Sequence, residues 1–250
     1  MKHPIRFPLP HFDEERYWQD VHEDNYDTVF SVTQDGALLG QILDVVARDT
    51  TRDILIPGCG TRTHLQQALL DRFGPSIETI ICTDFEPVVS LARPRLSSPQ
   101  VEFVGCPTQE LAFEEVFSVA IVVNSVVSAD DALNRAMLGR ISAGLRSGGR
   151  LIGLFPTIFT DIDLLSLGHD NQPVIDVRRN LIFESVQGVW QLAYSPLRLR
   201  LILKEAGLQL SDMRIVFLDS EEFLKQGREY YGIVDPDLPI WQLLVEARKL

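Results

Sequence analysis

The chain has 250 residues, of which 45% are hydrophobic and 23% charged, and this composition is typical of a globular protein rather than a disordered one. The formal net charge of −12 argues against general nucleic-acid binding, because a protein that neutralises several phosphates normally carries a basic patch. No apolar stretch approaches the roughly 18 residues of a membrane span, and the N-terminus lacks an apolar signal core. We therefore expect a cytoplasmic protein that binds neither membrane nor nucleic acid.

The N-terminal segment, residues 1–34, differs in character from the rest of the chain. Residues 1–12 are rich in proline and are expected to be extended, whereas residues 13–30 are expected to form one or two short helices. The second stretch carries the aromatic residues Tyr17, Trp18, Tyr26 and Phe30. We interpret the segment as a helical lid on the domain formed by residues 35–250.

Short apolar segments then alternate with amphipathic ones. The predicted strands are 53–56, 79–82, 101–104, 116–123 and 150–155, with a turn at 146–149 before the last of them. The predicted helices are 35–47, 61–73, 88–93 and 132–145. Because strands that alternate with helices pair in parallel through right-handed crossovers, this pattern predicts a doubly wound α/β sheet with helices on both faces.

Two closing strands are predicted at 214–218 and 241–246, after a helix at 196–206. They would complete a seven-stranded, mostly parallel sheet. Residues 157–195 break the rhythm of strand and helix, and we interpret them as an insertion before the last strands.

The residues that follow the first two predicted strands indicate a nucleotide-like ligand. Gly58 and Gly60, with Cys59 between them, allow the backbone to turn tightly and to approach a ligand at the N-terminus of the next helix. Asp84 follows the second strand, where a carboxylate can accept hydrogen bonds from both ribose hydroxyls. Alternatively, Asp84 only caps the following helix.

With these motifs in place, the chain resembles the class I (Rossmann-like) S-adenosylmethionine (SAM)-dependent methyltransferases over residues 35–250. Pro57-Gly-Cys-Gly60 is similar to the first motif of that superfamily, and Asp84-Phe85 is similar to its ribose-binding acid and the neighbouring adenine-stacking residue. Leu145–Ile152 resembles the turn before strand five, and the helix ending at Glu205-Ala-Gly-Leu208 follows in the expected order. The resemblance implies that SAM is the cofactor and that Gly58, Cys59, Gly60, Asp84 and Phe85 bind it.

Three positions depart from the superfamily's pattern. Ile56 stands where an acid is common, and Arg62 stands near the usual third glycine. The Arg62 guanidinium either pairs with the carboxylate of the cofactor or points to solvent. The acid that usually bonds the adenine amino group is replaced by Cys106-Pro-Thr108, so we expect Pro107 and Thr108 to contact the cofactor there.

Asn124 and Tyr26 are the residues assigned to catalysis. Asn124 follows the fourth strand, where the carboxyl ends of strands line the ligand crevice, and its amide oxygen can orient an amine of cofactor or substrate. The alternative for Asn124 is a turn-capping role. Tyr26, with Tyr17 as a cofactor contact, is expected to cover the positively charged sulfur from the lid, or else the aromatic residues there only pack the N-terminal helix.

A general base is not evident from the sequence. Methyl transfer from SAM requires mainly alignment and exclusion of water, so a base is needed only if the nucleophile arrives protonated. The candidates are Asp130, Asp131, His64 and His169. Scattered histidines and the absence of a CxxC pair predict no metal site.

The leading hypothesis is a SAM-dependent methyltransferase that acts on a small molecule in secondary metabolism. A second hypothesis keeps SAM but attacks its γ-carbon, which forms azetidine carboxylate or transfers the aminocarboxypropyl group and releases methylthioadenosine. A third is a SAM-binding module without catalysis. An NAD-dependent dehydrogenase is disfavoured because the later motifs do not match, and the sequence does not indicate an oligomeric state.

Overall fold

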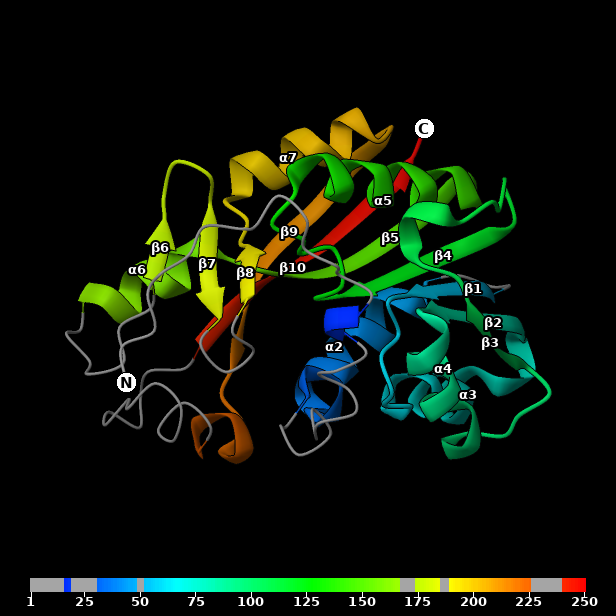
Figure 1. The fold of residues 1–250 in the computed structure, drawn as a ribbon. Coiled ribbons are helices and arrows are strands. Elements are labelled where there is room, and N and C mark those ends of the chain that lie inside the picture. The colour runs from blue at the N-terminus through cyan, green and yellow to red at the C-terminus, as the bar shows by residue number, and fades with distance from the viewer. Residues whose placement is uncertain (1–15, 19–30, 49–51, 167–173, 185–188, 226–239) are drawn as a thin grey trace.

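The computed structural model describes residues 16–18, 31–48, 52–166, 174–184, 189–225 and 240–250. Its centre is a seven-stranded sheet in the order β3-β2-β1-β4-β5-β10-β9 (Figure 1). The strands are β1 (Arg52–Pro57), β2 (Ile77–Asp84), β3 (Val101–Gly105), β4 (Phe117–Val123), β5 (Leu145–Pro156), β9 (Leu208–Leu218) and β10 (Ile240–Lys249). Strands β1 to β5 pair in parallel, and β10 runs antiparallel to both β5 and β9. The predicted doubly wound, mostly parallel sheet is therefore confirmed.

Helices cover both faces of the sheet. One face packs against α2 (Gly36–Val46) and α3 (His64–Phe73), and the other packs against α5 (Asp131–Gly144) and α7 (Pro196–Glu205). The alternation of side chains along a strand explains how β1 serves both layers. Ile54 and Leu55 are both fully buried, but Ile54 belongs to the core under α2 and α3 and Leu55 to the core under α5 and α7.

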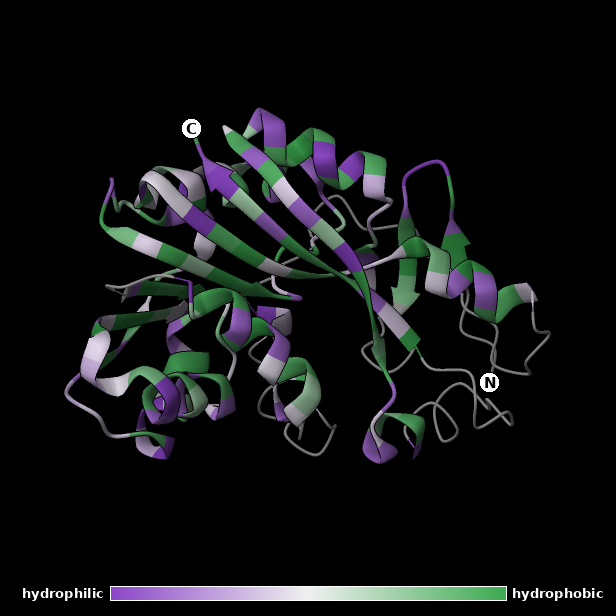
Figure 2. Ribbon diagram, turned by 180° about the vertical axis from the view of Figure 1, so that it is seen from behind, coloured by the Kyte–Doolittle hydropathy of each residue, from purple (hydrophilic) through white to green (hydrophobic). Residues whose placement is uncertain are grey.

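The central strands are apolar along most of their length because helices cover them on two sides. In β4, every residue from Val119 to Val122 has no exposed surface. Figure 2 shows hydrophobic residues concentrated on these strands and polar residues on the outer sides of the helices. A further helix, α4 (Glu86–Ala92), packs on β2 and β3. No helix in the described part of the chain is long and apolar enough to cross a membrane.

The predicted turn at 146–149 lies inside β5. Leu145 pairs with Phe117 and Arg150 pairs with Val119, so residues 146–149 face a single residue of β4 as a bulge. Gly148 provides the positive φ of 74° that this excursion requires. The glycine-rich composition is that of a turn, but after the bulge the backbone resumes its pairing with β4 as part of the same strand.

The region between β5 and α7 contains a small second sheet that the sequence did not predict. It follows α6 (Ile158–Ser166) and consists of β6 (Val174–Asp176), β7 (Leu181–Glu184) and β8 (Val189–Leu192), all antiparallel. The Leu192 N–H donates to the Val127 carbonyl at 2.9 Å, and Ser128 forms a bridge with Gln191. This sheet is thereby attached to the loop that follows β4.

Candidate functional site

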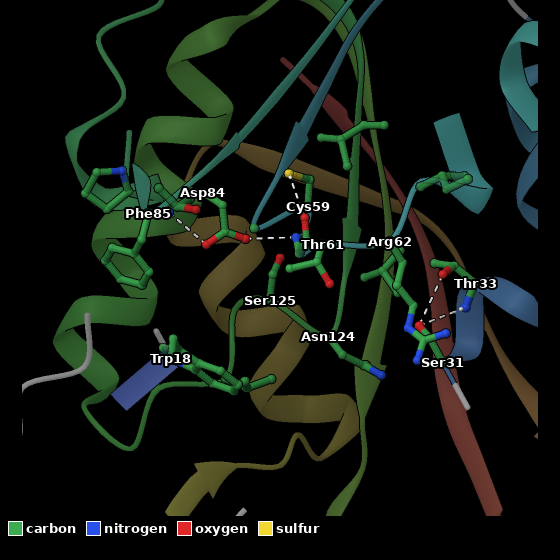
Figure 3. A pocket seen from close by; sticks show the side chains of 18 of the residues that line it. Trp18, Ser31, Thr33, Cys59, Thr61, Arg62, Asp84, Phe85, Asn124 and Ser125 are labelled. Carbon is green, nitrogen blue, oxygen red and sulfur yellow. Dashed lines mark hydrogen bonds between the residues drawn. The ribbon is translucent and has the colours of Figure 1, made fainter. Parts of the chain in front are cut away.

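A pocket of about 240 Å³ lies at the carboxyl ends of β1, β2 and β4. Strand order reverses between β1 and β4, and ligands of open α/β sheets bind at such a point. Most of the predicted cofactor-binding residues line the pocket: Gly58, Cys59, Gly60, Asp84, Phe85, Pro107, Thr108 and Asn124. The structure thus brings together residues from four separate loops (Figure 3).

The glycine loop has the backbone that its sequence predicts. Gly58 and Gly60 have φ angles of 61° and 64°, in the left-handed region. A Cβ on Gly58 would lie 2.3 Å from Cβ of Ser125, whose hydroxyl donates to the Pro57 carbonyl at 2.9 Å. Because the loop takes up six residues, α3 begins at His64, three residues later than predicted.

Asp84 connects the first two loops of the sheet. One carboxylate oxygen accepts from the Gly60 N–H and the other from the Phe85 N–H, each at 2.8 Å. The N-cap of α4 is Phe85, which makes no side-chain cap bond, so Asp84 holds the glycine loop rather than occupying the N-cap position. Burial raises the pKa of the Asp84 carboxyl to about 6, although the two N–H donors act to lower it.

Cys59 is held against the sheet by neutral contacts. Its N–H donates to the Thr83 carbonyl at 3.1 Å, and its thiol lies near Cys82 and the Gly60 carbonyl. The hydrogen bond with Cys82 and burial both raise the pKa of the Cys59 thiol well above its ordinary value. The thiol is therefore neutral at physiological pH, and in the pocket it acts as a small packing group.

Three amide oxygens at the pocket are buried and have no hydrogen-bond partner among the described residues. They are Oδ1 of Asn124, Oε1 of Gln109 and Oε1 of Gln66, all on pocket-lining residues. Asn124 also has a φ of 48°, a left-handed conformation that asparagine tolerates better than most residues. A buried acceptor without a donor is costly, so these three oxygens mark places where a ligand can donate hydrogen bonds.

Arg62 lines the pocket instead of pointing to solvent. Its Nη1 donates to Oε1 of Gln34, which also accepts from the Ser31 N–H at 2.8 Å. Figure 3 shows Arg62 beside Ser31 and Thr33 on one side of the pocket and Asp84 with Phe85 on the other side. Gln34, Ser31 and Gln109 were not identified from the sequence, because none of them belongs to a ligand-binding motif or directly follows a predicted strand.

The predicted lid is only partly described. Tyr26 and Phe30 lie outside the described residues, and so does most of residues 1–34. Tyr17 and Trp18 are described: their rings meet edge to face with centroids 5.1 Å apart, and Trp18 lines the pocket. An aromatic ring from the N-terminal segment thus borders the site. This ring is that of Trp18, whereas the sequence predicted a cofactor contact from the neighbouring Tyr17.

The candidate bases lie in structural contacts or on the surface. Asp130 caps α5 through the Ala132 N–H at 2.9 Å. For Asp131, burial acts to raise the carboxyl pKa, but hydrogen bonds from Arg198 and Arg135 outweigh it and hold the pKa below its ordinary value. His64 is exposed, and His169 lies outside the described residues. The described residues contain no cluster of three or more histidine, cysteine or acidic side chains for a metal ion.

No protein-family model and no curated protein sequence matches the chain. Solved structures do match. 1,6-Didemethyltoxoflavin-N1-methyltransferase from Burkholderia thailandensis, solved with 1,6-didemethyltoxoflavin and S-adenosylhomocysteine, superposes with a TM-score of 0.63 at 19% identity, over 98% of this chain and 93% of that one. The N-methyltransferase NodS from Bradyrhizobium japonicum, solved with S-adenosylhomocysteine, gives 0.57 at 13% identity, over 93% and 98%. A SAM-dependent methyltransferase from Methanosarcina mazei gives 0.60 at 14% identity, over 82% and 97%. The chain therefore has the fold of the class I SAM-dependent methyltransferases, as its motifs predicted.

Proposed function

We propose that this chain, with its class I methyltransferase fold, binds SAM in the pocket and transfers the methyl group to a small molecule. The observation that carries the proposal is the Asp84 carboxylate at the end of β2, bound to the Gly60 N–H of the glycine loop where strand order reverses. This is the place and the chemistry that a ribose requires in an open α/β sheet. Two structural neighbours with bound S-adenosylhomocysteine support the choice of cofactor.

The residues present are suited to SAM along the whole pocket. Phe85 offers a ring face for the adenine beside the Asp84 carboxylate (Figure 3), and Pro107 and Thr108 also line the pocket. The buried Oε1 of Gln109 supplies an acceptor in the region where the superfamily's usual acid is missing. At the centre, Oδ1 of Asn124 accepts an N–H from an amine, either of the cofactor or of the acceptor.

SAM supplies a methyl group that the positive sulfur already activates for displacement. The protein contributes alignment and a site that excludes water. Trp18 borders the pocket as an aromatic face that attracts a sulfonium, and Tyr17 packs against it. Asn124 orients an acceptor amine, and Tyr26 remains a proposed catalytic residue of the lid. No described residue of the pocket is a strong base, which favours an acceptor that is already unprotonated.

A small-molecule acceptor is proposed from the neighbours and from the pocket. One neighbour acts on 1,6-didemethyltoxoflavin, and a second is named an N-methyltransferase. Among the described residues that line this pocket, Arg62 is the one cationic side chain, and the whole chain has a net charge of −12, so a polyanionic acceptor is disfavoured. Of the alternatives, attack on the γ-carbon of SAM would use the same pocket, and analysis of the reaction products distinguishes it from methyl transfer.

The first test is mass spectrometry of purified protein after incubation with SAM alone. We expect SAM to persist, and isothermal titration calorimetry to show binding of SAM and S-adenosylhomocysteine. Addition of small amines and hydroxylated aromatics should then yield S-adenosylhomocysteine and a product heavier by one methylene unit. Methylthioadenosine with a new amino-acid product would overturn methyl transfer, and a protein that binds neither cofactor form would overturn the proposal entirely.

A further inference from the structure

We propose that the Arg62 guanidinium forms a carboxylate subsite in this pocket and discriminates ligands that carry the amino-acid carboxylate of SAM from ligands that lack it. The inference rests on the proposed function, because it concerns the same pocket. It deepens that function by assigning recognition of the methionine end to a side chain at a position where a third glycine is usual.

Charge is distributed unevenly in the pocket. Among the described residues that line it, only Asp84 and Arg62 are charged. They lie on opposite sides, with Asn124 between them (Figure 3). S-Adenosylmethionine has a matching asymmetry, with hydroxyl donors on its ribose and a carboxylate at the far end of its methionine chain. A ribose at Asp84 therefore directs the carboxylate toward Arg62.

The orientation of Arg62 is set by the short helical turn at Val32–Gln34. Ser31 caps this turn, and its N–H donates to Oε1 of Gln34 at 2.8 Å, which closes a capping box. The same Oε1 accepts from Nη1 of Arg62. The amide of Gln34 is neutral, so this hydrogen bond orients the guanidinium and does not itself oppose its positive charge, and the planar group has the geometry that pairs with a carboxylate.

The start of α3 adds to the positive potential at this place. Arg62 precedes the N-cap residue Thr63, which makes no side-chain cap bond. The free N–H groups of a helix N-terminus and the helix dipole both favour an anion. The Arg62 side chain, next to this helix N-terminus, strengthens the preference for an anion, and its guanidinium can donate two parallel hydrogen bonds to a carboxylate.

The test compares two ligands that differ by one group: S-adenosylhomocysteine and its decarboxylated analogue, in which an aminopropyl chain replaces the amino-acid chain. Calorimetry would measure both against wild type, Arg62→Gln and Arg62→Lys. The matched control is Arg72→Gln, which removes the same charge from an exposed arginine of α3 that pairs with Asp44 on the surface. No acceptor is present, so a carboxylate of the substrate does not contribute.

We expect Arg62→Gln to weaken S-adenosylhomocysteine binding roughly 10- to 100-fold and the decarboxylated analogue less than about twofold. Arg62→Lys should recover part of the loss, and Arg72→Gln should change neither ligand. Unchanged binding of the analogue also reports that the variant is folded. Equal losses for both ligands, or no loss for either, would overturn the subsite and leave the proposed function standing. A wild-type protein that binds neither ligand would overturn both proposals.

Discussion

The carboxylate of Asp84 accepts hydrogen bonds from the Gly60 and Phe85 N–H groups, and burial raises its pKa to about 6. A bound ribose adds hydroxyl donors, which stabilise the charged form further. By linkage, the affinity for S-adenosylhomocysteine should fall as the pH drops through about 6, approaching tenfold per pH unit below it. Calorimetry between about pH 7.5 and about pH 5 measures this slope.

The control for this pH dependence is Asp84→Asn. It should bind more weakly at neutral pH, by roughly 10- to 100-fold, because a charge-assisted acceptor is lost. Its affinity should then be flat across the same pH range. A slope as steep as that of the wild type would assign the titration to another group.

Substitutions at Gly58 and Gly148 distinguish two ways in which a side chain destabilises a left-handed residue: backbone strain and steric overlap. Both have positive φ angles, but a Cβ on Gly148 meets no atom within 4 Å, whereas one on Gly58 would lie 2.3 Å from Cβ of Ser125. Gly148→Ala should lower the free energy of unfolding by about 1 to 2 kcal/mol through backbone strain alone. Gly58→Ala should lose at least about 1 kcal/mol more. Urea denaturation measures the free energy of unfolding of both variants. Equal losses of stability would show that Ser125 moves away from the new side chain without cost.

Site residues were predictable from sequence only where a backbone rule applies. Gly58 and Gly60 lie in the loop after β1 and Asp84 is the last residue of β2, so their place at the pocket follows from the parallel sheet. Arg62 was ambiguous, because the first residues of a helix can face the ligand or the solvent, and the contact with Gln34 that orients it joins segments 28 residues apart. Gln109 lies in a short helical turn after β3 that has no distinguishing motif.

At the scale of elements, burial on both faces made the central strands predictable. The segment 116–123 is almost uniformly apolar, and the structure has β4 at Phe117–Val123. The strands of the small sheet are three or four residues long and several of their residues are half-buried, so they carry too little periodicity to be recognised. In β5, the local composition at 146–149 indicated a turn, but Leu145 before it and Arg150 after it both pair with β4, so these residues form a bulge within one strand.

A buried ion pair connects the three elements β5, β10 and α2. Glu246 of β10 pairs with Arg150 of β5 at 3.0 Å, and the other nitrogen of that guanidinium donates to the Val45 carbonyl of α2 at 2.9 Å. Arg150 is 3% exposed, so removal of the Glu246 carboxylate takes an ion-pair partner away from a buried guanidinium. Glu246→Ala should lower the free energy of unfolding by about 3 to 5 kcal/mol.

Two variants distinguish this effect from a general loss of charge. Asp44→Ala breaks the exposed pair with Arg72 and should cost less than about 1 kcal/mol. The double variant Arg150→Met with Glu246→Leu should recover most of the loss, since it removes both buried charges, and the Arg48 guanidinium that also pairs with Glu246 is exposed to solvent. Chemical denaturation of all three measures the difference, and a double variant no more stable than Glu246→Ala would mean that shape rather than charge controls this site.

At the scale of the whole molecule, the doubly wound, mostly parallel sheet and its two helical layers were predictable from the alternation of elements. The division into a segment of residues 1–34 and a domain of residues 35–250 with an insertion stays a prediction, because large parts of that segment lie outside the described residues. The small sheet does contact the loop after β4 through Leu192 and Gln191, next to pocket-lining Val127 and Ser128. Such a contact depends on tertiary packing, and no local pattern in the sequence predicts it.

The pocket joins loops from both halves of the sheet, so a ligand there should stabilise the fold as a unit. Gly58 and Asp84 lie at the ends of β1 and β2, in the half of the sheet that runs to the edge strand β3. Asn124 and Ser125 follow β4, the first strand of the other half, and lead toward α5. S-Adenosylhomocysteine at about 100 times its Kd should add about 2.7 kcal/mol to the free energy of unfolding. For a chain of this size, that corresponds to a rise in Tm of about 5 to 11 °C. Differential scanning calorimetry measures the shift, with Asp84→Asn at the same ligand concentration as the control, which should shift less. If calorimetric titration shows saturation while Tm stays constant, the pocket loops open independently of the sheet, and the unfolding would occur in more than one step.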